Sequence, residues 1–181
     1  MTHNRTIHRD TVRPEWVDYN GHLRDAFYML IFSLSTDAFM DRIGLDDAAR
    51  TSRGRSLFTL EAHINYLHEI KEGAAVRVEA SVLAFDAKRA HLYMEMFADE
   101  GAEPIAASEQ MLLHVDTTNG AKSAAFDADI ASRIQAMFRD APKEARYAGR
   151  VIGLPSGPRA TTSTAASASA SASAPAAAKP A

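Results

Sequence analysis

Hydrophobic residues recur at intervals of three and four between Leu23 and Gly44. The positions with this spacing are Ala26, Phe27, Leu30, Ile31, Leu34, Ala38, Phe39 and Ile43. The pattern predicts a buried helix of about twenty residues that ends at Gly44. Further apolar side chains occupy its other sides, at Met29, Phe32 and Met40. Because almost the whole circumference is apolar, we expect other elements to wrap around this helix.

Alternation of polar and apolar residues predicts strands before and after the helix. These are Arg5–Trp16, an edge strand that runs into a loop at Pro14, and then Ser56–His68, Ala75–Phe85, Arg89–Phe97 and Ile105–Asp116. Four consecutive long strands after one buried helix indicate an antiparallel meander curled around that helix, which is an α+β fold. A shorter amphipathic helix is predicted over Asp127–Phe138.

The composition changes near the C-terminus. Residues 155–181 consist almost entirely of Ala, Ser, Thr and Pro and contain no large apolar side chain. Such a segment buries too little surface to offset the entropy of ordering it. We therefore expect one folded domain over residues 1–154, followed by a disordered tail over residues 155–181.

Charge and cysteine content exclude several classes of protein. The 181-residue chain has a net charge of -3 without basic blocks, which argues against a nucleic-acid or anionic-membrane partner. It has no cysteine, which excludes disulfides, thiolate metal sites and cysteine nucleophiles. The longest apolar stretch, Tyr28–Leu34, is too short to span a bilayer, and Met1–Asp10 has no apolar segment typical of secretory signals. A cytoplasmic protein is expected.

The candidate chemistry lies just before the long helix, in the segment Asp18–His22, which contains a carboxylate, an amide and an imidazole. A helix N-terminus presents unpaired N–H groups that stabilise a polarised carbonyl or an oxyanion. A carboxylate beside such a position is what hydrolysis of an activated acyl group needs. The alternative is that Asp18 closes an Asx turn, with Asn20 and Gly21 as ordinary turn residues.

The pattern Asp18-x-x-Gly21-His22, followed by Tyr28, resembles the D-x-x-G-H-V-N-N-x-x-Y signature of hotdog-fold acyl-CoA thioesterases of the 4-hydroxybenzoyl-CoA type. The order of predicted elements over residues 5–140 is similar as well. The resemblance implies a hotdog fold, in which a long central helix is wrapped by a curved antiparallel sheet. It also implies an enzyme that hydrolyses acyl-CoA thioesters.

The same resemblance assigns roles to individual residues. It implies that Asp18 is the catalytic carboxylate, acting as nucleophile or as general base on water. It implies further that the thioester carbonyl lies against N–H groups near Arg24 and Asp25, which replace the family's usual Asn pair. The D-x-N-x-H spacing is similar to that of plant acyl-carrier-protein thioesterases, in which the equivalents of Asn20 and His22 assist the Asp.

The amino-acid sequences of Val12–His22 and Thr59–Leu67 resemble most the betainyl-CoA thioesterases of carnitine catabolism. This resemblance implies a substrate with a trimethylammonium group, which aromatic faces bind by cation–π contact. The candidate aromatic residues are Trp16, Tyr19, Phe27, Tyr28 and Tyr66.

Further candidates lie on and just before the strand Ser56–His68. Asn65 falls where the plant enzymes carry a catalytic Glu, so it is expected to help hold water, with Glu61 on the same strand face as a spare base or substrate contact. The alternative is that Glu61, His63 and Asn65 form a polar strand face that only contacts solvent. Arg53 and Arg55 are candidates for coenzyme A phosphates, although such loop arginines are most often only solvated.

Metal and cofactor chemistry find little support in the sequence. Asp18, His22 and Asp25 could offer three ligands, but no established zinc spacing such as H-E-x-x-H is present. A Ser-His-Asp triad is unsupported, because the chain lacks a G-x-S-x-G elbow. We expect hydrolysis without metal or cofactor.

The sequence therefore predicts a hotdog acyl-CoA thioesterase that acts on a small acyl-CoA, with betainyl-CoA as the favoured substrate. One alternative is an acyl-CoA hydratase or dehydratase, whose D-x-N-P-x-H motif differs here because Gly21 and His22 follow Asn20 directly. Another is a non-catalytic acyl-CoA binding module. The exposed edge of Ser56–His68 is expected to pair with a second copy of the chain, giving a homodimer or a homotetramer.

Overall fold

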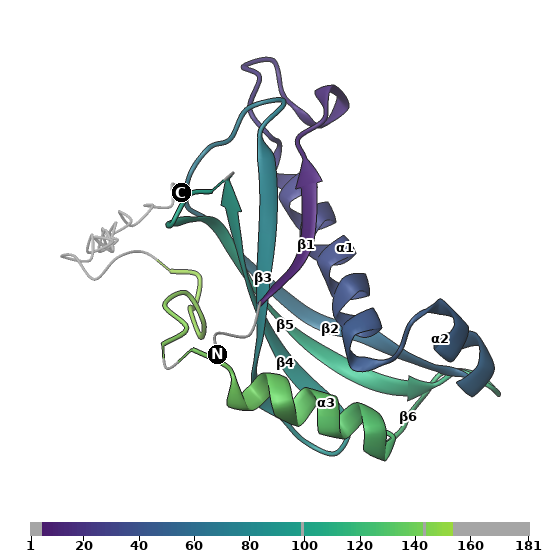
Figure 1. Ribbon diagram of the computed structural model, residues 1–181. Coiled ribbons are helices and arrows are strands. Elements are labelled where there is room, and N and C mark those ends of the chain that lie inside the picture. Colours follow the sequence, from purple (N-terminus) through teal and green to yellow (C-terminus); the bar gives the residue numbers. More distant parts are fainter. Residues whose placement is uncertain (1–4, 99, 143, 154–181) are drawn as a thin grey trace, which may run out of the picture. The chain divides into compact units, whose positions relative to one another are not determined.

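The computed structural model describes residues 5–98, 100–142 and 144–153 (Figure 1). Its strands are β1 (Thr6–Thr11), β2 (Arg55–Tyr66), β3 (Ala75–Phe85), β4 (Arg89–Ala98), β5 (Pro104–Asp116) and β6 (Lys122–Ser123). Its helices are the short η1 (Pro14–Trp16), α1 (Asp25–Ile43), α2 (Asp47–Arg53) and α3 (Ala128–Arg139). The described residues up to Arg150 form one unit. The predicted tail lies outside the described residues, and the boundary after residue 154 stays a prediction.

The strands form one antiparallel sheet in the order β1-β3-β4-β5-β2, with β6 paired to β5. The predicted meander is confirmed for β3, β4 and β5, and β1 is an edge strand as expected. The prediction is wrong for β2, which pairs with β5 and not with β3. Residue alternation identifies the two faces of a strand, but it carries no information about which strand lies beside it.

The connection between β2 and β3 explains this arrangement. Residues 67–74 lead from the end of β2, at one edge of the sheet, to β3, which lies next to the opposite edge strand β1. On the way they contact the loop that precedes α1. The N–H of Leu23 donates to the carbonyl of Ile70 (2.8 Å), and the N–H of Gly73 donates to that of Val12 (2.9 Å). The crossing segment and the loop are therefore joined by backbone hydrogen bonds.

Helix α1 packs lengthwise on one face of the sheet, as Figure 1 shows. Phe32, Phe39 and Ile43 are completely buried against it, and the hydroxyl of Thr36 donates to Gln110 Oε1 on β5 (2.9 Å). Gly44 ends the helix with φ of 88°, a conformation that glycine adopts without strain. Both ends of the predicted helix are thus confirmed to within two residues.

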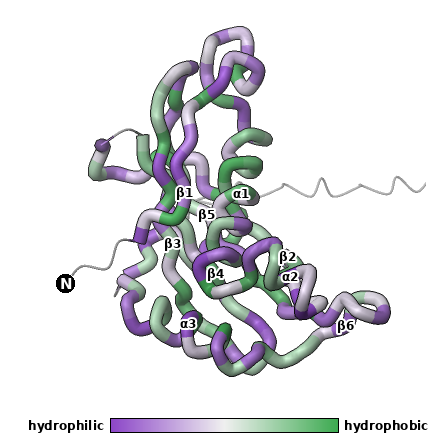
Figure 2. The backbone as a smooth tube through the Cα atoms, turned by 45° about the vertical axis from the view of Figure 1, so that its right-hand side comes forward, coloured by the Kyte–Doolittle hydropathy of each residue, from purple (hydrophilic) through white to green (hydrophobic). Residues whose placement is uncertain are grey.

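The sheet covers only part of the apolar circumference of α1. Figure 2 shows hydrophobic residues concentrated along this helix, yet Leu30 remains 38% exposed. Sequence patterning did not predict α2, because none of its residues is buried and no apolar stripe marks it. Its ends carry the usual local signals: Asp46 accepts the Ala49 N–H (2.8 Å) at the start, and Gly54 follows its last residue.

Candidate active site

Asp18 lies at the start of a tight loop that the backbone closes on itself. The N–H of Asp18 donates to the carbonyl of His22 (2.9 Å), and the N–H of Gly21, where φ is 75°, donates to the carbonyl of Asp18 (3.0 Å). The carboxylate accepts the N–H groups of Asn20 (2.8 Å) and His22 (3.1 Å), both at Oδ1. The Asx-turn geometry is therefore present, while Oδ2 accepts no hydrogen bond from the described residues.

These contacts also fix the charge on Asp18. The His22 N–H has the largest effect and lowers the pKa of the carboxyl group below its ordinary value. Burial opposes this effect, and the Asn20 N–H lowers the pKa by a smaller amount. The group is consequently ionised at neutral pH, as a nucleophile or general base must be. A turn-forming role and a chemical role use different oxygens and can coexist.

The imidazole of His22 lies beside Glu69 on the crossing segment. Its Nε2 lies 3.5 Å from Glu69 Oε2, and the backbone around it forms an antiparallel bridge with Lys71. His22 therefore contacts Asp18 through its main chain and the crossing segment through its ring. The predicted assistance of His22 to Asp18 stays a prediction.

A pocket of about 280 Å³ opens at the start of α1. It is lined by Leu23, Asp25, Tyr28, Tyr66, Leu67, His68 and Glu69. The hydroxyl of Tyr28 donates to the His68 carbonyl (3.1 Å), and the rings of Tyr28 and Tyr66 meet edge to face at 5.4 Å. Tyr66 and Asp25, two of the predicted substrate contacts, line this pocket, and their roles stay predictions. Sequence analysis did not single out Glu69, because no motif marks it.

The negative charges of the pocket act on both tyrosines. Burial raises the pKa of Tyr28, and the nearby Glu69 carboxylate raises it further. Burial and the Asp25 carboxylate likewise raise the pKa of Tyr66. Both phenols are therefore neutral at physiological pH, and the pocket combines two aromatic rings with two carboxylates.

The first N–H groups of the helix are largely engaged. The N–H of Arg24 donates to the Trp16 carbonyl (3.1 Å), that of Phe27 to the Arg24 carbonyl (3.0 Å), and that of Ala26 to Asp25 Oδ1 (2.8 Å). The Arg24 side chain donates to the Val17 carbonyl (3.0 Å). The N–H and the side chain of Arg24 are thus both engaged, which leaves the Asp25 N–H as the candidate donor. The predicted contact of the thioester carbonyl with N–H groups near Arg24 and Asp25 stays a prediction.

Three of the five predicted aromatic contacts, Trp16, Phe27 and Tyr19, do not line the pocket. Trp16 is only 5% exposed; Phe27 stacks on its ring at 5.6 Å, and the Arg13 guanidinium lies 4.4 Å from the ring centre. Neighbours thus cover the indole, which disfavours a ligand contact. Tyr19 is 94% exposed at the tip of the loop and does not line the pocket.

Asn65 and Glu61 lie on the face of the sheet that points away from α1. Gln110 bonds to α1, so its neighbour Glu109 faces the opposite side, and His63 pairs with Glu109 in register. The Asn65 amide donates to the Tyr147 carbonyl (3.3 Å). Within one subunit the structure does not bring Asn65 or Glu61 to Asp18, so their predicted roles gain no support from this geometry.

That face holds a polar cluster centred on Glu109. Its carboxylate lies 3.0 Å from His91 Nε2 and 3.6 Å from His63 Nδ1, and both its oxygens accept the Gly149 N–H at 3.0 Å. Burial raises the pKa of Glu109, but the Gly149 N–H and His91 outweigh this effect and hold it below its ordinary value. The cluster holds the segment around Gly149 against the sheet.

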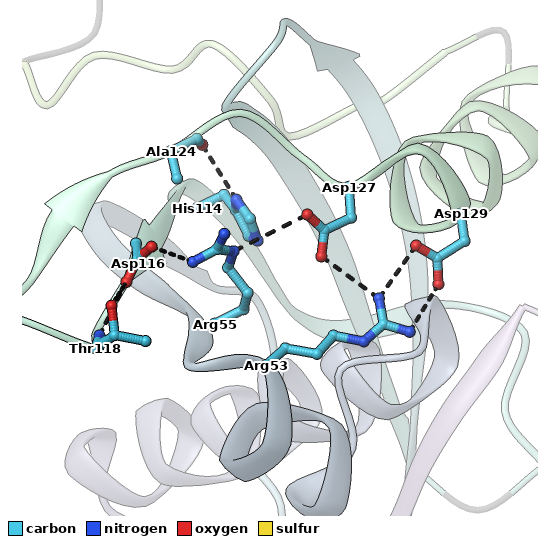
Figure 3. Close-up of polar contacts among 8 residues, drawn as sticks. All are labelled: Arg53, Arg55, His114, Asp116, Thr118, Ala124, Asp127 and Asp129. Carbon is cyan, nitrogen blue, oxygen red and sulfur yellow. Dashed lines mark hydrogen bonds and ion pairs between the residues drawn. The ribbon is translucent and has the colours of Figure 1, made fainter.

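Arg53 and Arg55, considered above as phosphate ligands, are occupied by carboxylates (Figure 3). Arg53 binds Asp129 through two hydrogen bonds (3.1 and 3.0 Å) and reaches Asp127 at 3.4 Å. Arg55 binds Asp116. These pairs tie the α2–β2 junction to the end of β5 and the start of α3, which is a structural role.

Among the residues that the structure describes, no three His, Asp or Glu side chains are grouped so that they could hold a metal ion. None of the described helices is long and apolar enough to cross a membrane.

A long helix on a curled antiparallel sheet, with an acidic loop and a pocket at the helix start, defines the hotdog class of thioesterases. The chain belongs to the thioesterase-like superfamily, whose family profile matches residues 12–134. It is 49% identical over 158 residues to the betainyl-CoA thioesterase of Pseudomonas aeruginosa PAO1, covering 86% of this chain and 98% of that protein.

Solved structures agree with this assignment. A candidate thioesterase of Pseudomonas putida KT2440 is 49% identical, with a TM-score of 0.71 over 83% of this chain and 96% of that one. A Staphylococcus aureus protein in complex with CoA is 28% identical, with a TM-score of 0.74 and the same coverage of 83% and 96%. The predicted hotdog fold and the predicted enzyme class, a thioester hydrolase, are confirmed.

Proposed function

We propose that this thioesterase hydrolyses betainyl-CoA to betaine and coenzyme A in the cytoplasm. The observation that carries the proposal is the pocket at the start of α1, in which Tyr28 and Tyr66 stand beside Asp25 and Glu69. Aromatic rings and carboxylates together suit a quaternary ammonium group. The 49% identical relative named betainyl-CoA thioesterase supports the same substrate, and the CoA complex of the Staphylococcus aureus protein supports binding of the CoA portion.

In the proposed reaction, the acyl group occupies the pocket and its thioester carbonyl lies at the helix start, near the Asp25 N–H. Oδ2 of Asp18 either attacks the carbonyl carbon or removes a proton from the attacking water. On the general-base route, the carbon–sulfur bond breaks and Asp18 passes the proton to the departing sulfur, so that coenzyme A leaves as the thiol and water has supplied the new oxygen of betaine. On the nucleophilic route, coenzyme A leaves as the thiolate and takes a proton from solvent, and water then hydrolyses the acyl–aspartyl anhydride, which restores the carboxylate and releases betaine. The positive end of α1 stabilises the oxyanion that forms on the way.

We further propose that two subunits pair through the outer edge of β2. In the described part of the chain, β2 pairs with β5 on one side and with no strand on the other. Leu60 and Tyr66 on this strand are 56% and 54% exposed, which is unusual for large apolar side chains on a free edge. Tyr66 also lines the pocket, so the partner would lie next to the substrate. Two such dimers would form the tetramer that the sequence analysis gave as the alternative assembly.

The substrate proposal is tested by measuring thiol release from a panel of CoA thioesters that includes betainyl-, acetyl- and butyryl-CoA. The expected result is hydrolysis with the highest kcat/KM for betainyl-CoA. A change in enoyl absorbance without thiol release would indicate a hydratase, and tight binding without turnover would indicate a binding module.

The assembly is tested by light scattering coupled to size-exclusion chromatography. The expected mass is that of a dimer or a tetramer, and Leu60→Lys should shift it toward the monomer, because it buries a charge at the proposed contact. Phe138→Lys on α3 is the control, since Phe138 is exposed but far along the chain from β2. A monomeric wild-type protein would contradict the proposal.

A further inference from the structure

We infer that Glu69, together with Asp25, selects cationic acyl groups over neutral groups of the same shape. The inference deepens the proposed function and rests on it. It assigns to two carboxylates the discrimination by charge, and to the tyrosines Tyr28 and Tyr66 the recognition of shape.

Neither of these carboxylates forms an ion pair with a lysine or arginine of the described residues. Glu69 forms a single ion pair, with His22 at 3.5 Å, and Asp25 forms none with any lysine or arginine of the described residues. By contrast, the neighbouring carboxylates Asp127 and Asp129 both form ion pairs with Arg53. The pocket therefore retains negative charge that a bound cation would neutralise.

The two carboxylates reach the pocket from different elements, because Asp25 begins α1 whereas Glu69 follows the end of β2. Glu69 and Asp25 each raise the pKa of one pocket tyrosine, Tyr28 and Tyr66 respectively, which places both charges within electrostatic reach of the cavity.

The chemistry of the ligand favours the same assignment. A trimethylammonium group has no N–H to donate, so a protein recognises it by aromatic faces and by nearby negative charge. A tert-butyl group has the same shape without the charge. Aromatic and apolar walls accept both groups, whereas carboxylates favour only the cation, so the difference between the two substrates isolates the contribution of Glu69 and Asp25.

The experiment compares betainyl-CoA with 3,3-dimethylbutanoyl-CoA, in which tert-butyl replaces trimethylammonium. The ratio of their kcat/KM values is measured for the wild type, Glu69→Gln, Asp25→Asn and the double variant. Asparagine at position 25 can still accept the Ala26 N–H. Glu72→Gln is the matched control, because Glu72 is an exposed acid of the same segment that does not line the pocket.

Each single pocket variant should lower the ratio about three- to tenfold, chiefly through betainyl-CoA, because a charge near the surface acts across a high effective dielectric. The double variant should lower it by roughly the product, and Glu72→Gln should leave it within about twofold. Salt should reduce the wild-type ratio and have little effect on that of the double variant.

Three outcomes overturn the inference. Equal losses for both substrates in Glu69→Gln would mean that Glu69 only positions His22. An unchanged ratio would mean that neither carboxylate senses the acyl charge. Hydrolysis of both substrates at equal rates by the wild type would remove charge selection while leaving a thioesterase, whereas release of thiol from neither would overturn the proposed function itself.

Discussion

Two regions of this protein gather charged side chains, and they treat them in opposite ways. At the α2–β2 junction, Arg53 and Arg55 each bind carboxylates from β5 or the start of α3. At the start of α1, Asp25 and Glu69 line a pocket without an arginine or lysine partner among the described residues. We call the α2–β2 junction the closed region, because its arginines and carboxylates pair with one another. The carboxylates at the start of α1 remain available to a bound cation.

The difference teaches how to separate structural charges from functional ones. In the sequence, Arg53-Gly54-Arg55 and the Asp18–Asp25 stretch both place charges beside a glycine, and the arginines are the weaker candidates for a ligand contact. Their tertiary partners separate them further. A guanidinium that already holds carboxylates contributes to stability, while a carboxylate that faces a cavity retains its capacity to bind or react.

The largest expected effect separates the two regions by activity. Asp18→Asn should lower kcat/KM for betainyl-CoA by at least about a thousandfold, because it removes the reacting charge. The fold should be kept, since an asparagine side-chain oxygen can accept the same N–H groups of residues 20 and 22. Thiol-release kinetics and circular dichroism of the purified variant measure both quantities.

Asp129→Asn is the matched control from the closed region, because it removes a carboxylate that binds only Arg53 and a helix start. Its kcat/KM should stay within about twofold of the wild type. Turnover of Asp18→Asn at the wild-type rate would refute the assignment of Asp18.

The second prediction concerns the stability of the closed region. Gly54→Ala should lower the free energy of unfolding by about 2 kcal/mol, because alanine disfavours positive φ and its methyl group must displace a neighbour. The backbone at Gly54 has φ of 61°, and an added Cβ would lie 2.3 Å from Thr118 Cγ2. Urea denaturation measures the change, and activity at low denaturant should be unaffected.

A second variant separates the two causes. Gly54→Ala combined with Thr118→Ser removes the obstructing methyl group and keeps the hydroxyl that binds Asp116. It should recover part of the loss and leave about 1 kcal/mol for the strained backbone. Recovery of none of the loss would show that the contact with Thr118 is irrelevant.

The third prediction uses pH to compare the two regions. The hydroxyl and N–H of Thr118, and then Arg55, lower the pKa of Asp116 to about 2. Because the folded pKa lies below the unfolded one, this contribution to stability is present above about pH 4 and is lost as the pH falls toward 2. Urea midpoints measured from pH 5 down to pH 2.5 should fall less steeply in Asp116→Asn than in the wild type.

At the candidate site, acid pH should lower the activity of the enzyme. The His22 N–H lowers the pKa of Asp18, so kcat/KM should stay constant below neutrality and fall only under the ordinary pKa of an aspartate. An acid limb near pH 6 would instead point to a histidine as the group that must be deprotonated.

The smallest effect is expected at the exposed edge of the closed region. Arg53→Gln should lower the melting temperature by no more than about 2 °C, because the Arg53 side chain is 38% exposed and its ion pairs are screened by solvent. Adding salt to the wild type should remove most of this difference. A loss above about 5 °C would show that the pairs are far less screened than their exposure indicates.

Much of the fold could be predicted from the sequence, because the information is local. The spacing of apolar residues defines α1, and Gly44 marks its end; the turn at Gly73 and the alternation that follows it define β3. The position of β2 beside β5 could not be predicted, since it depends on where residues 67–74 lead the chain. α2 was missed because it buries no side chain.

The candidate site divides in the same way. Asp18 and the turn at Gly21 follow from short-range spacing, and Tyr66 was identified as an aromatic residue near the loop. Glu69 could not be found, because it reaches the pocket only through the crossing of the chain after β2. Asn65 was assigned from its place along the strand, but side-chain direction alternates, and here it points to the far face, toward Tyr147.

The direct continuation of β2 into the pocket wall has a practical consequence. Leu67, His68 and Glu69 follow the last residue of this edge strand without a break, so whatever lies on the outer edge also sets the position of one side of the cavity. If that edge is shared between subunits, turnover per molecule will fall when the protein is diluted below the dissociation constant of the dimer. Assays at nanomolar enzyme would then understate its capacity at cellular abundance.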